Sequence, residues 1–205
     1  MIKGTFLILF IIVIMSQIKT EYQKNVRKIL QETFNYKNPH EIPKLEKIVI
    51  NMGLGLNAQN KTFFQKALNE IRLITGQHPI VTVSKKSIAG FKIREKMTLG
   101  LKVTLRREKM YAFYEKLTKL VFPRKRDFRG ISIEQFDSDG NLSIGIHDQL
   151  VFPEIEFDSV EQRRGFNITI VTTAKTGKEG FILLKELGFP FVPAEFKTEK
   201  IQKHQ

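Results

Sequence analysis

The stretch VTVSKKSIAGFKIREKMTLGLKVT, residues 81–104, decides how this chain is organised. Its two ends are rich in β-branched residues, which is typical of strands. Its middle sets a single acid, Glu95, against five cations: Lys85, Lys86, Lys92, Arg94 and Lys96. Ala89 and Gly90 stand at the centre, where a sharp bend or a close approach to another backbone favours small residues. We therefore predict two strands joined by a long basic loop that can enter a polyanion; a solvated hairpin tip is the alternative.

The composition of the whole chain supports a polyanionic partner. Among 205 residues, 34 Lys and Arg stand against 21 Asp and Glu, a formal net charge of +13. Such an excess predicts nucleic acid as the first candidate partner and an anionic membrane as the second. A basic surface kept for solubility alone is the alternative, but it rarely needs so large an excess. The chain has no Cys, which excludes disulfides and zinc ribbons, and its four His residues show no metal-ligand spacing. We expect neither a metal nor a cofactor.

Hydrophobic periodicity divides the rest of the chain into strands and helices. Strands are predicted over residues 44–51, 80–83, 99–105, 141–146 and 168–172. Helices are predicted from Ser16 to about Thr33, over 64–74 with Gly76 as the end, from Glu108 until Pro123 stops it, and over 178–187. Because several strands connect as hairpins, the expected fold class is α+β, a mixed or antiparallel sheet packed on helices.

The two ends of the chain differ from this pattern. FLILFIIVIM, residues 6–15, is an apolar run too short to span a bilayer alone, and no signal-peptidase site follows it. A membrane anchor is therefore disfavoured, but a membrane-associated basic protein stays as an alternative. We expect the functional fold to begin at Met15, with residues 1–15 an apolar extension that need not be translated. Residues 16–191 would form one domain, and 192–205 a polar tail.

A glycine motif offers a second alternative from a different class. GLGLNA, residues 53–58, satisfies the G-x-G-x-x-A fingerprint between a predicted strand and a predicted helix. The next strand ends in Ser84, Lys85 and Lys86, which lack the acid for a ribose hydroxyl but could suit a 2′-phosphate. An NADP-dependent oxidoreductase thus stays open. Because the remainder does not continue as strand–helix–strand units and shows no catalytic constellation, we favour a tight turn and no enzyme.

Eight motifs carry a family resemblance over nearly the whole chain, from about residue 16 to residue 191. They are KIVINMGLG (47–55), TGQHP (75–79), SIAGFKIR (87–94), KVTLR (102–106), MYAFYEKL (110–117), RDFRGIS (126–132), QLVFPEI (149–155) and LGFPF (187–191). With these the chain resembles the fifth protein of the large ribosomal subunit, of the bacterial and plastid type. MYAF and LVFPEI are closer to cyanobacterial and plastid members.

The resemblance implies a structural constituent of the ribosome. The family binds 5S ribosomal RNA in the central protuberance, and its basic loop reaches the transfer RNA in the peptidyl site. The implied ribosomal RNA contacts are Asn51, Gln77, Thr104 and Arg106. The implied loop contacts to transfer RNA are Lys85, Lys86, Ser87, Ala89, Gly90, Lys92 and Arg94. Further partners would be large-subunit ribosomal RNA and neighbouring proteins of the central protuberance, with no small-molecule substrate. Plastid ribosomes are favoured; a bacterial cytoplasm and a mitochondrion are alternatives.

Amide, hydroxyl and guanidinium groups suit such contacts, since together they donate to and accept from phosphates, 2′-hydroxyls and base edges. Simpler roles exist: Asn51 could hold its own turn, and Thr104 could be an ordinary strand residue. Phe91 could stack on a base or anchor the loop to the core, and we favour anchoring.

Three segments depart from the family pattern. The usual Gly after T-L-R is Arg107, which predicts an altered turn or a new phosphate contact. The usual F-D-G-R-G-N is FDSDGN, residues 136–141, which loses one Gly and one cation. The usual Arg of G-V-R-E-Q is His147, so any RNA contact of that Arg is in doubt here.

Overall fold

The computed structural model describes residues 17–126, 128–157, 160 and 162–192. The expected apolar extension over 1–15, the Ser16 cap and the tail after residue 192 lie outside the described residues.

Five strands form one antiparallel sheet in the order β2-β3-β1-β5-β4. They are β1 (Leu45–Gly53), β2 (Ile80–Val83), β3 (Thr98–Leu105), β4 (Leu142–Ile146) and β5 (Phe166–Thr172). All five predicted strands are present, and the α+β class is confirmed. β1 is central, pairing with β3 on one side and β5 on the other, so segments far apart in sequence meet across it.

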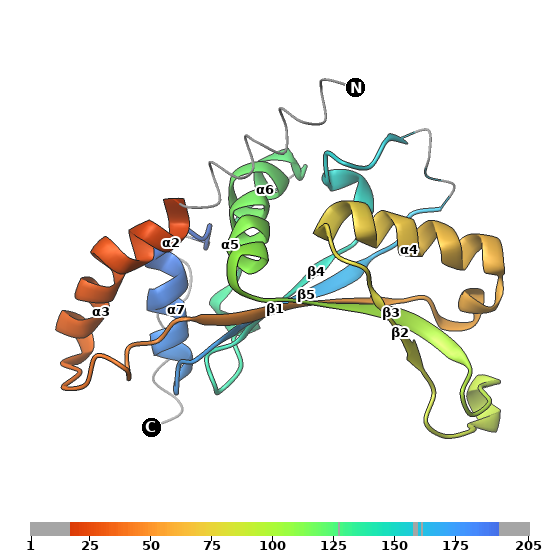
Figure 1. Ribbon diagram of the computed structural model, residues 1–205, viewed down its shortest axis with the longest axis horizontal. Helices are drawn as coiled ribbons and strands as arrows, with labels where there is room; N and C mark the ends of the chain where they lie inside the picture. The colour runs from red at the N-terminus through yellow and green to blue at the C-terminus, as the bar shows by residue number, and fades with distance from the viewer. Residues whose placement is uncertain (1–16, 127, 158–159, 161, 193–205) are drawn as a thin grey trace.

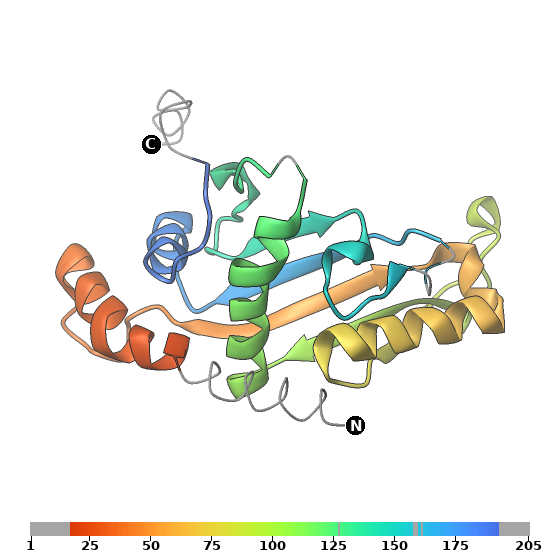
Figure 2. The ribbon, with the colours of Figure 1, turned by 90° about the horizontal axis from the view of Figure 1, so that it is seen from above.

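The predicted helices are also present. The first runs continuously through α2 (Gln17–Glu21), η1 (Tyr22–Val26) and α3 (Arg27–Phe34). The others are α4 (Lys61–Thr75), α5 (Arg107–Lys116) with its continuation η4 (Leu117–Val121) and α6 (Phe122–Arg124), and α7 (Gly177–Glu186). Gly76 ends α4 in the left-handed region, with φ 63°, as predicted. Figures 1 and 2 show α4 and α5 over the same face of the sheet, and α3 and α7 beside each other at one end.

The expectation that Pro123 stops the third helix is wrong by one residue. The helix passes through Pro123 and ends after Arg124, where Lys125 is extended. A proline removes one helical donor and crowds the carbonyl four residues earlier. The turn directly before it, η4, is a wider π-helical turn, which gives the ring room.

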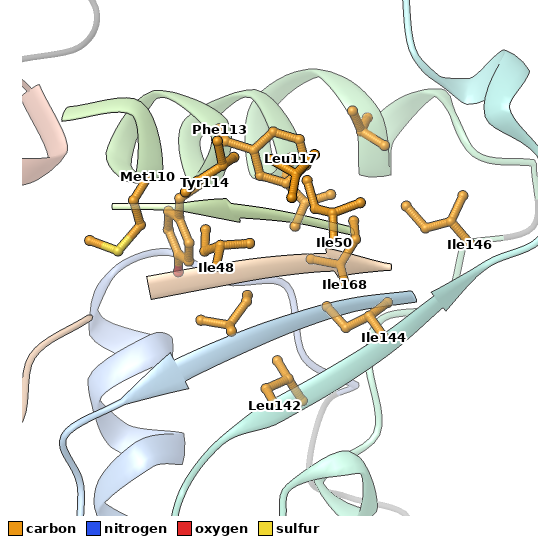
Figure 3. Packing of buried hydrophobic residues seen from close by; sticks show 14 of the residues in the cluster. Ile48, Ile50, Met110, Phe113, Tyr114, Leu117, Leu142, Ile144, Ile146 and Ile168 are labelled. Atoms are coloured by element: carbon orange, nitrogen blue, oxygen red, sulfur yellow. The ribbon is translucent and has the colours of Figure 1, made fainter. Parts of the chain in front are cut away.

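The buried face of the sheet packs against α5. Ile48 and Ile50 of β1 are almost fully buried, and Figure 3 shows them beneath Phe113, Tyr114 and Leu117 of that helix. Tyr114 has no exposed surface, and its hydroxyl donates to the carbonyl of Leu184 in α7 at 3.4 Å. Burial raises the pKa of Tyr114 well above its ordinary value, so the phenol stays neutral and available as a donor. This residue ties α5 to α7 through the core.

A buried ion pair fixes α4 against the segment that precedes β5. The guanidinium of Arg164 lies 2.6 Å from the carboxylate of Glu70, and both side chains are almost fully buried. Arg164 also lies over the ring of Phe63, 4.1 Å from its centroid, and its backbone N–H donates to Gln149. Burial raises the pKa of Glu70, and the neighbouring Arg164 offsets part of that shift. The pair therefore fixes α4 relative to the segment before β5, and it adds little to the net free energy of unfolding.

We predict that Arg164→Ala lowers the free energy of unfolding by about 3–5 kcal/mol, because it leaves the Glu70 charge buried without a partner. The double variant Arg164→Met, Glu70→Leu should lose far less, since it removes both charges and keeps apolar volume. Arg163→Ala is the matched control, as that neighbouring side chain is 75% exposed. Urea unfolding measures all three; equal losses in the single and double variants would contradict the argument.

Candidate nucleic-acid interface

The register of the sheet gathers polar side chains on the face opposite α4 and α5. Asn51 in β1 is paired with Lys102 in β3 and with Asn167 in β5. All three are exposed, while their sequence neighbours are buried. One row across the sheet therefore holds an ammonium group and two amides.

A second row runs parallel to the first, two residues along the strands. Val49 in β1 is paired with Thr104 and Thr169, and Thr169 is paired with Ser143 in β4. The hydroxyls of Ser143 and Thr169 lie 3.2 Å apart. We call these two rows the open face: Val49, Asn51, Lys102, Thr104, Ser143, Asn167 and Thr169.

Only Asn51 and Thr104 of the open face were predicted as RNA contacts. Lys102, Ser143, Asn167 and Thr169 share this face but were not among the predicted contacts. Their signal is the polar–apolar alternation of β3, β4 and β5, which marks which residues share a face. That alternation does not say which strands are neighbours, and the rows exist only once the strand order is known.

The structure gives the predicted contact residues different local roles. The Asn51 amide has no hydrogen-bond partner within the described residues, so a role in holding its own turn is not observed. Gln77 has one: its Nε2 donates to the carbonyl of Thr104 at 3.2 Å, beyond the last pair that β2 makes with β3. The Gln77 side chain thus hydrogen-bonds β3 where β2 no longer pairs with it, and this bond holds Gln77 beside Thr104.

Arg106 follows directly after β3 and is the residue before α5. Its side chain is 56% exposed, and its guanidinium lies 3.5 Å from the carboxylate of Glu46 at the start of β1. Glu46 also lies 3.4 Å from Lys47. Because exposed pairs of this length are weak, Arg106 can exchange Glu46 for a phosphate at little cost.

Arg107 adopts a backbone conformation suited to glycine. Its φ is 53°, in the left-handed region, at the first residue of α5. The chain thus places an arginine in a backbone conformation that a glycine adopts readily. The exposed Arg107 follows Arg106 directly, so two exposed arginines stand next to each other in the sequence where β3 ends.

The basic loop, residues 84–97 between β2 and β3, is ordered by its own hydrogen bonds. Ser84 donates from its backbone N–H to the carbonyl of Met97 at 2.9 Å, and its hydroxyl bonds the carbonyl of Arg94. The hydroxyl of Ser87 accepts from the N–H of Glu95 at 2.9 Å. Figure 1 shows the loop, in yellow-green, extending beyond the sheet on the side where α4 begins.

The predicted contact residues of this loop all lie on its surface: Lys85, Lys86, Ser87, Ala89, Gly90, Lys92 and Arg94. Within the described part of the chain none of its five cations pairs with an acid. The expected anchoring of Phe91 is wrong, because its side chain is 68% exposed. The loop is held by its backbone and by Ser84, and it does not need an aromatic anchor.

The dinucleotide interpretation of residues 53–58 is also wrong. Gly53 ends β1, and η2 (Gly55–Gln59) follows, but β1 is antiparallel to both of its neighbours. A dinucleotide fold requires parallel strands joined by crossover helices. Gly55 has φ 57°, so the motif is a tight turn that positions α4.

The two remaining departures from the family pattern leave the local backbone intact. Gly140, which is retained, has φ 75°, and a Cβ there would come within 2.7 Å of the Thr176 carbonyl. Ser138 is not in the left-handed region, so the lost glycine was not required. His147 is exposed just after β4.

No helix among the described residues is long and apolar enough to cross a membrane.

One face of this sheet is covered by helices, and the other carries amides, hydroxyls and a cation. It adjoins a basic loop whose cations have no acidic partner among the described residues, and together these features define a nucleic-acid-binding protein. The comparisons with known proteins identify which kind. Residues 38–94 match the family described as ribosomal protein L5, and residues 98–191 match the model of the C-terminus of the same family.

Similar proteins cover most of the chain. Large ribosomal subunit protein uL5c of Gracilaria tenuistipitata var. liui is 57% identical over 85% of this chain and 98% of its own length. The uL5c protein of Heterosigma akashiwo is 56% identical over 86% and 98%, and uL5 of Rippkaea orientalis is 53% identical over 85% and 97%. The chain belongs to this family of ribosomal proteins. It is a structural constituent of the large ribosomal subunit and not an enzyme.

We predict that Arg107→Gly stabilises the protein by about 0.5–1 kcal/mol, because a left-handed conformation is strained for residues with a Cβ. The gain is the released strain minus the larger entropy of glycine in the unfolded chain. Arg107→Ala is the control: it removes the guanidinium but keeps the Cβ, and should give no gain. Urea unfolding at neutral pH compares the two, and a loss of stability in Arg107→Gly would contradict the argument.

Proposed function

We propose that the open face and Arg106 bind 5S ribosomal RNA in the central protuberance, and that the basic loop contacts the transfer RNA in the peptidyl site. One observation carries this proposal: the open face with Arg106 and the basic loop are two separate polar surfaces. Among the described residues, few acids neutralise the cations of either surface. Membership of the family implies contact with ribosomal RNA and with other ribosomal proteins.

The open face has the chemistry for RNA with little sequence specificity. Asn51 and Asn167 each offer a donor and an acceptor, the three hydroxyls offer both, and Lys102 offers a charge. RNA helices present 2′-hydroxyls and phosphates across a wide, shallow groove, which a flat polar sheet can approach. Gln77 and Arg106 extend this surface at the end of β3.

The basic loop suits a second, separate RNA. The loop extends beyond the end of the sheet (Figure 1), and no described acid neutralises its cations. Lys and Arg side chains in this state attract phosphates strongly and release counterions on binding. Its backbone hydrogen bonds fix its shape in advance, which lowers the entropy lost on binding.

We further propose that the ribosome is that of a plastid. The relatives at 56–57% identity named above carry the plastid designation uL5c. Proteins designated uL5, from Rippkaea orientalis and Nostoc punctiforme, are nearly as similar, at 53%. The order of these identities favours the plastid over a bacterial cytoplasm.

We predict that Arg106→Ala weakens 5S RNA binding about ten- to a hundred-fold, the usual effect of losing one charge-assisted contact. Glu46→Gln should leave binding unchanged or stronger, since Arg106 then has no competing carboxylate. Filter binding of purified protein to 5S RNA, at two salt concentrations, measures both.

Arg72→Ala is the matched control for this experiment, because Arg72 is an exposed arginine of α4, on the other side of the sheet. It should bind 5S RNA like the unmodified protein. Equal losses in Arg72→Ala and Arg106→Ala would show a diffuse charge effect and remove the assigned role of Arg106. Circular dichroism confirms that each variant is folded.

We also predict that replacing Lys85, Lys86 and Lys92 with Ala spares 5S binding but shortens the residence of transfer RNA in the peptidyl site. The three charges lie on the basic loop and not on the open face. Salt should diminish the difference, since it screens the lost attraction. The measurement is transfer RNA dissociation from large subunits reconstituted with each variant.

The control removes the same charge elsewhere. Lys24, Lys28 and Lys37 are exposed and lie on or just after the first helix, at the other end of the molecule. Their replacement with Ala should not change transfer RNA dissociation. If the loop variant instead loses 5S binding as severely as Arg106→Ala, the division between the two surfaces is wrong.

A further inference from the structure

Phe91 is held at the tip of the basic loop by a closed turn. Ile88 and Ile93 exchange both backbone hydrogen bonds, at 2.9 and 3.2 Å, across the base of the tip. Between them lies η3 (Ala89–Phe91), and Lys92, in the left-handed region with φ 54°, donates its N–H to the carbonyl of Ala89 at 3.0 Å. The ring therefore sits on a short, hydrogen-bonded turn and not on a free segment.

The Phe91 ring has no aromatic or cationic neighbour among the described residues. It is 68% exposed. The fold does not need it as an anchor, because Ser84 and Ser87 hold the loop through their hydroxyls. An exposed ring at a fixed position is free to contact a partner.

The surroundings of the ring identify the chemistry of that partner. Lys92 follows it directly, and Lys85, Lys86, Arg94 and Lys96 lie on the same loop. Cations that draw in phosphates, with an aromatic ring between them, are the pattern of surfaces on which a base stacks while its backbone is neutralised. A ring inserted into a protein partner would instead be expected within an apolar patch with a polar rim. Within residues 84–97 the other exposed large hydrophobic is Ile88, at 47%, and cations outnumber these two side chains.

Gly90 directly precedes Phe91, and the fold does not require a glycine at this position. A Cβ there would meet nothing within 4 Å, and its φ is not in the left-handed region. The turn therefore tolerates a larger side chain directly beside Phe91 in the sequence, which allows access to the ring to be tested by substitution.

We propose that Phe91 stacks on an unpaired base of the transfer RNA that the basic loop contacts. This inference rests on the proposed function of the loop and adds a contact of a different physical kind. The lysines provide attraction that depends on salt and not on the base, whereas stacking requires an exposed base and responds little to salt.

The test measures transfer RNA dissociation from the peptidyl site of large subunits reconstituted with the full-length chain. Phe91→Leu keeps an apolar side chain but removes the aromatic face, and should speed dissociation about five- to a hundred-fold. Phe91→Trp and Phe91→Tyr should retain the original rate, and Gly90→Leu should speed dissociation by crowding the ring. The matched control is Phe157→Leu, since Phe157 is 74% exposed and lies outside the basic loop.

The results separate this inference from the function on which it rests. A faster rate for Phe91→Leu that persists at high salt, with the original rate in the Trp and Tyr variants, supports stacking. A rate unchanged by Phe91→Leu, while the triple lysine variant is faster, overturns stacking and leaves the loop function standing. If neither variant changes the rate, both are overturned.

Discussion

Strand β1 lies in the middle of the sheet, hydrogen-bonded to β3 on one side and β5 on the other, and both faces of the molecule depend on that register. Ile48 and Ile50 point under α5, and Val49 and Asn51 point the other way. Because side chains alternate along a strand, a slip of one residue would bury Asn51 and expose Ile50. Close packing beneath Phe113, Tyr114 and Leu117 makes that slip costly. The hydrophobic core thus places the polar rows of the open face.

The two proposed RNA surfaces are built on different physical terms. The open face is rigid because it is the back of a packed sheet, and its polar groups are neutral amides and hydroxyls with one lysine. The basic loop is ordered by local hydrogen bonds. Its cations repel one another, so a bound polyanion stabilises the loop as well as being attracted by it. A surface of the first kind suits a permanent partner, and one of the second kind suits a partner that comes and goes.

Several residues carry conformations that are unfavourable locally and are held by what surrounds them. Arg107 and Lys92 are left-handed without being glycine. Glu70 and Arg164 are charged and buried. In each case a neighbouring interaction compensates: the start of α5, the turn that closes the loop tip, and the contact of Arg164 with Phe63. Arg107 follows Arg106 and Lys92 lies on the basic loop, so both strained cations belong to or adjoin the proposed RNA surfaces.

The sequence by itself determined the elements of this fold, because periodicity and turn chemistry are local. The five strands, Gly76 as the end of α4, and the basic loop all follow from patterns within a few residues, and the family motifs named the proposed contact residues. Tertiary structure alone decided what depends on neighbours. Because β1 pairs antiparallel with both neighbours, the glycine motif that begins at Gly53 is a turn and not a cofactor-binding motif. The strand order places Ser143, Asn167 and Lys102 on the same face of the sheet as Asn51. The exposure of Phe91 was likewise decided by tertiary structure, because the sequence of a loop does not determine whether the loop packs against the core. Local patterns encode which way a side chain alternates; only packing decides what it faces.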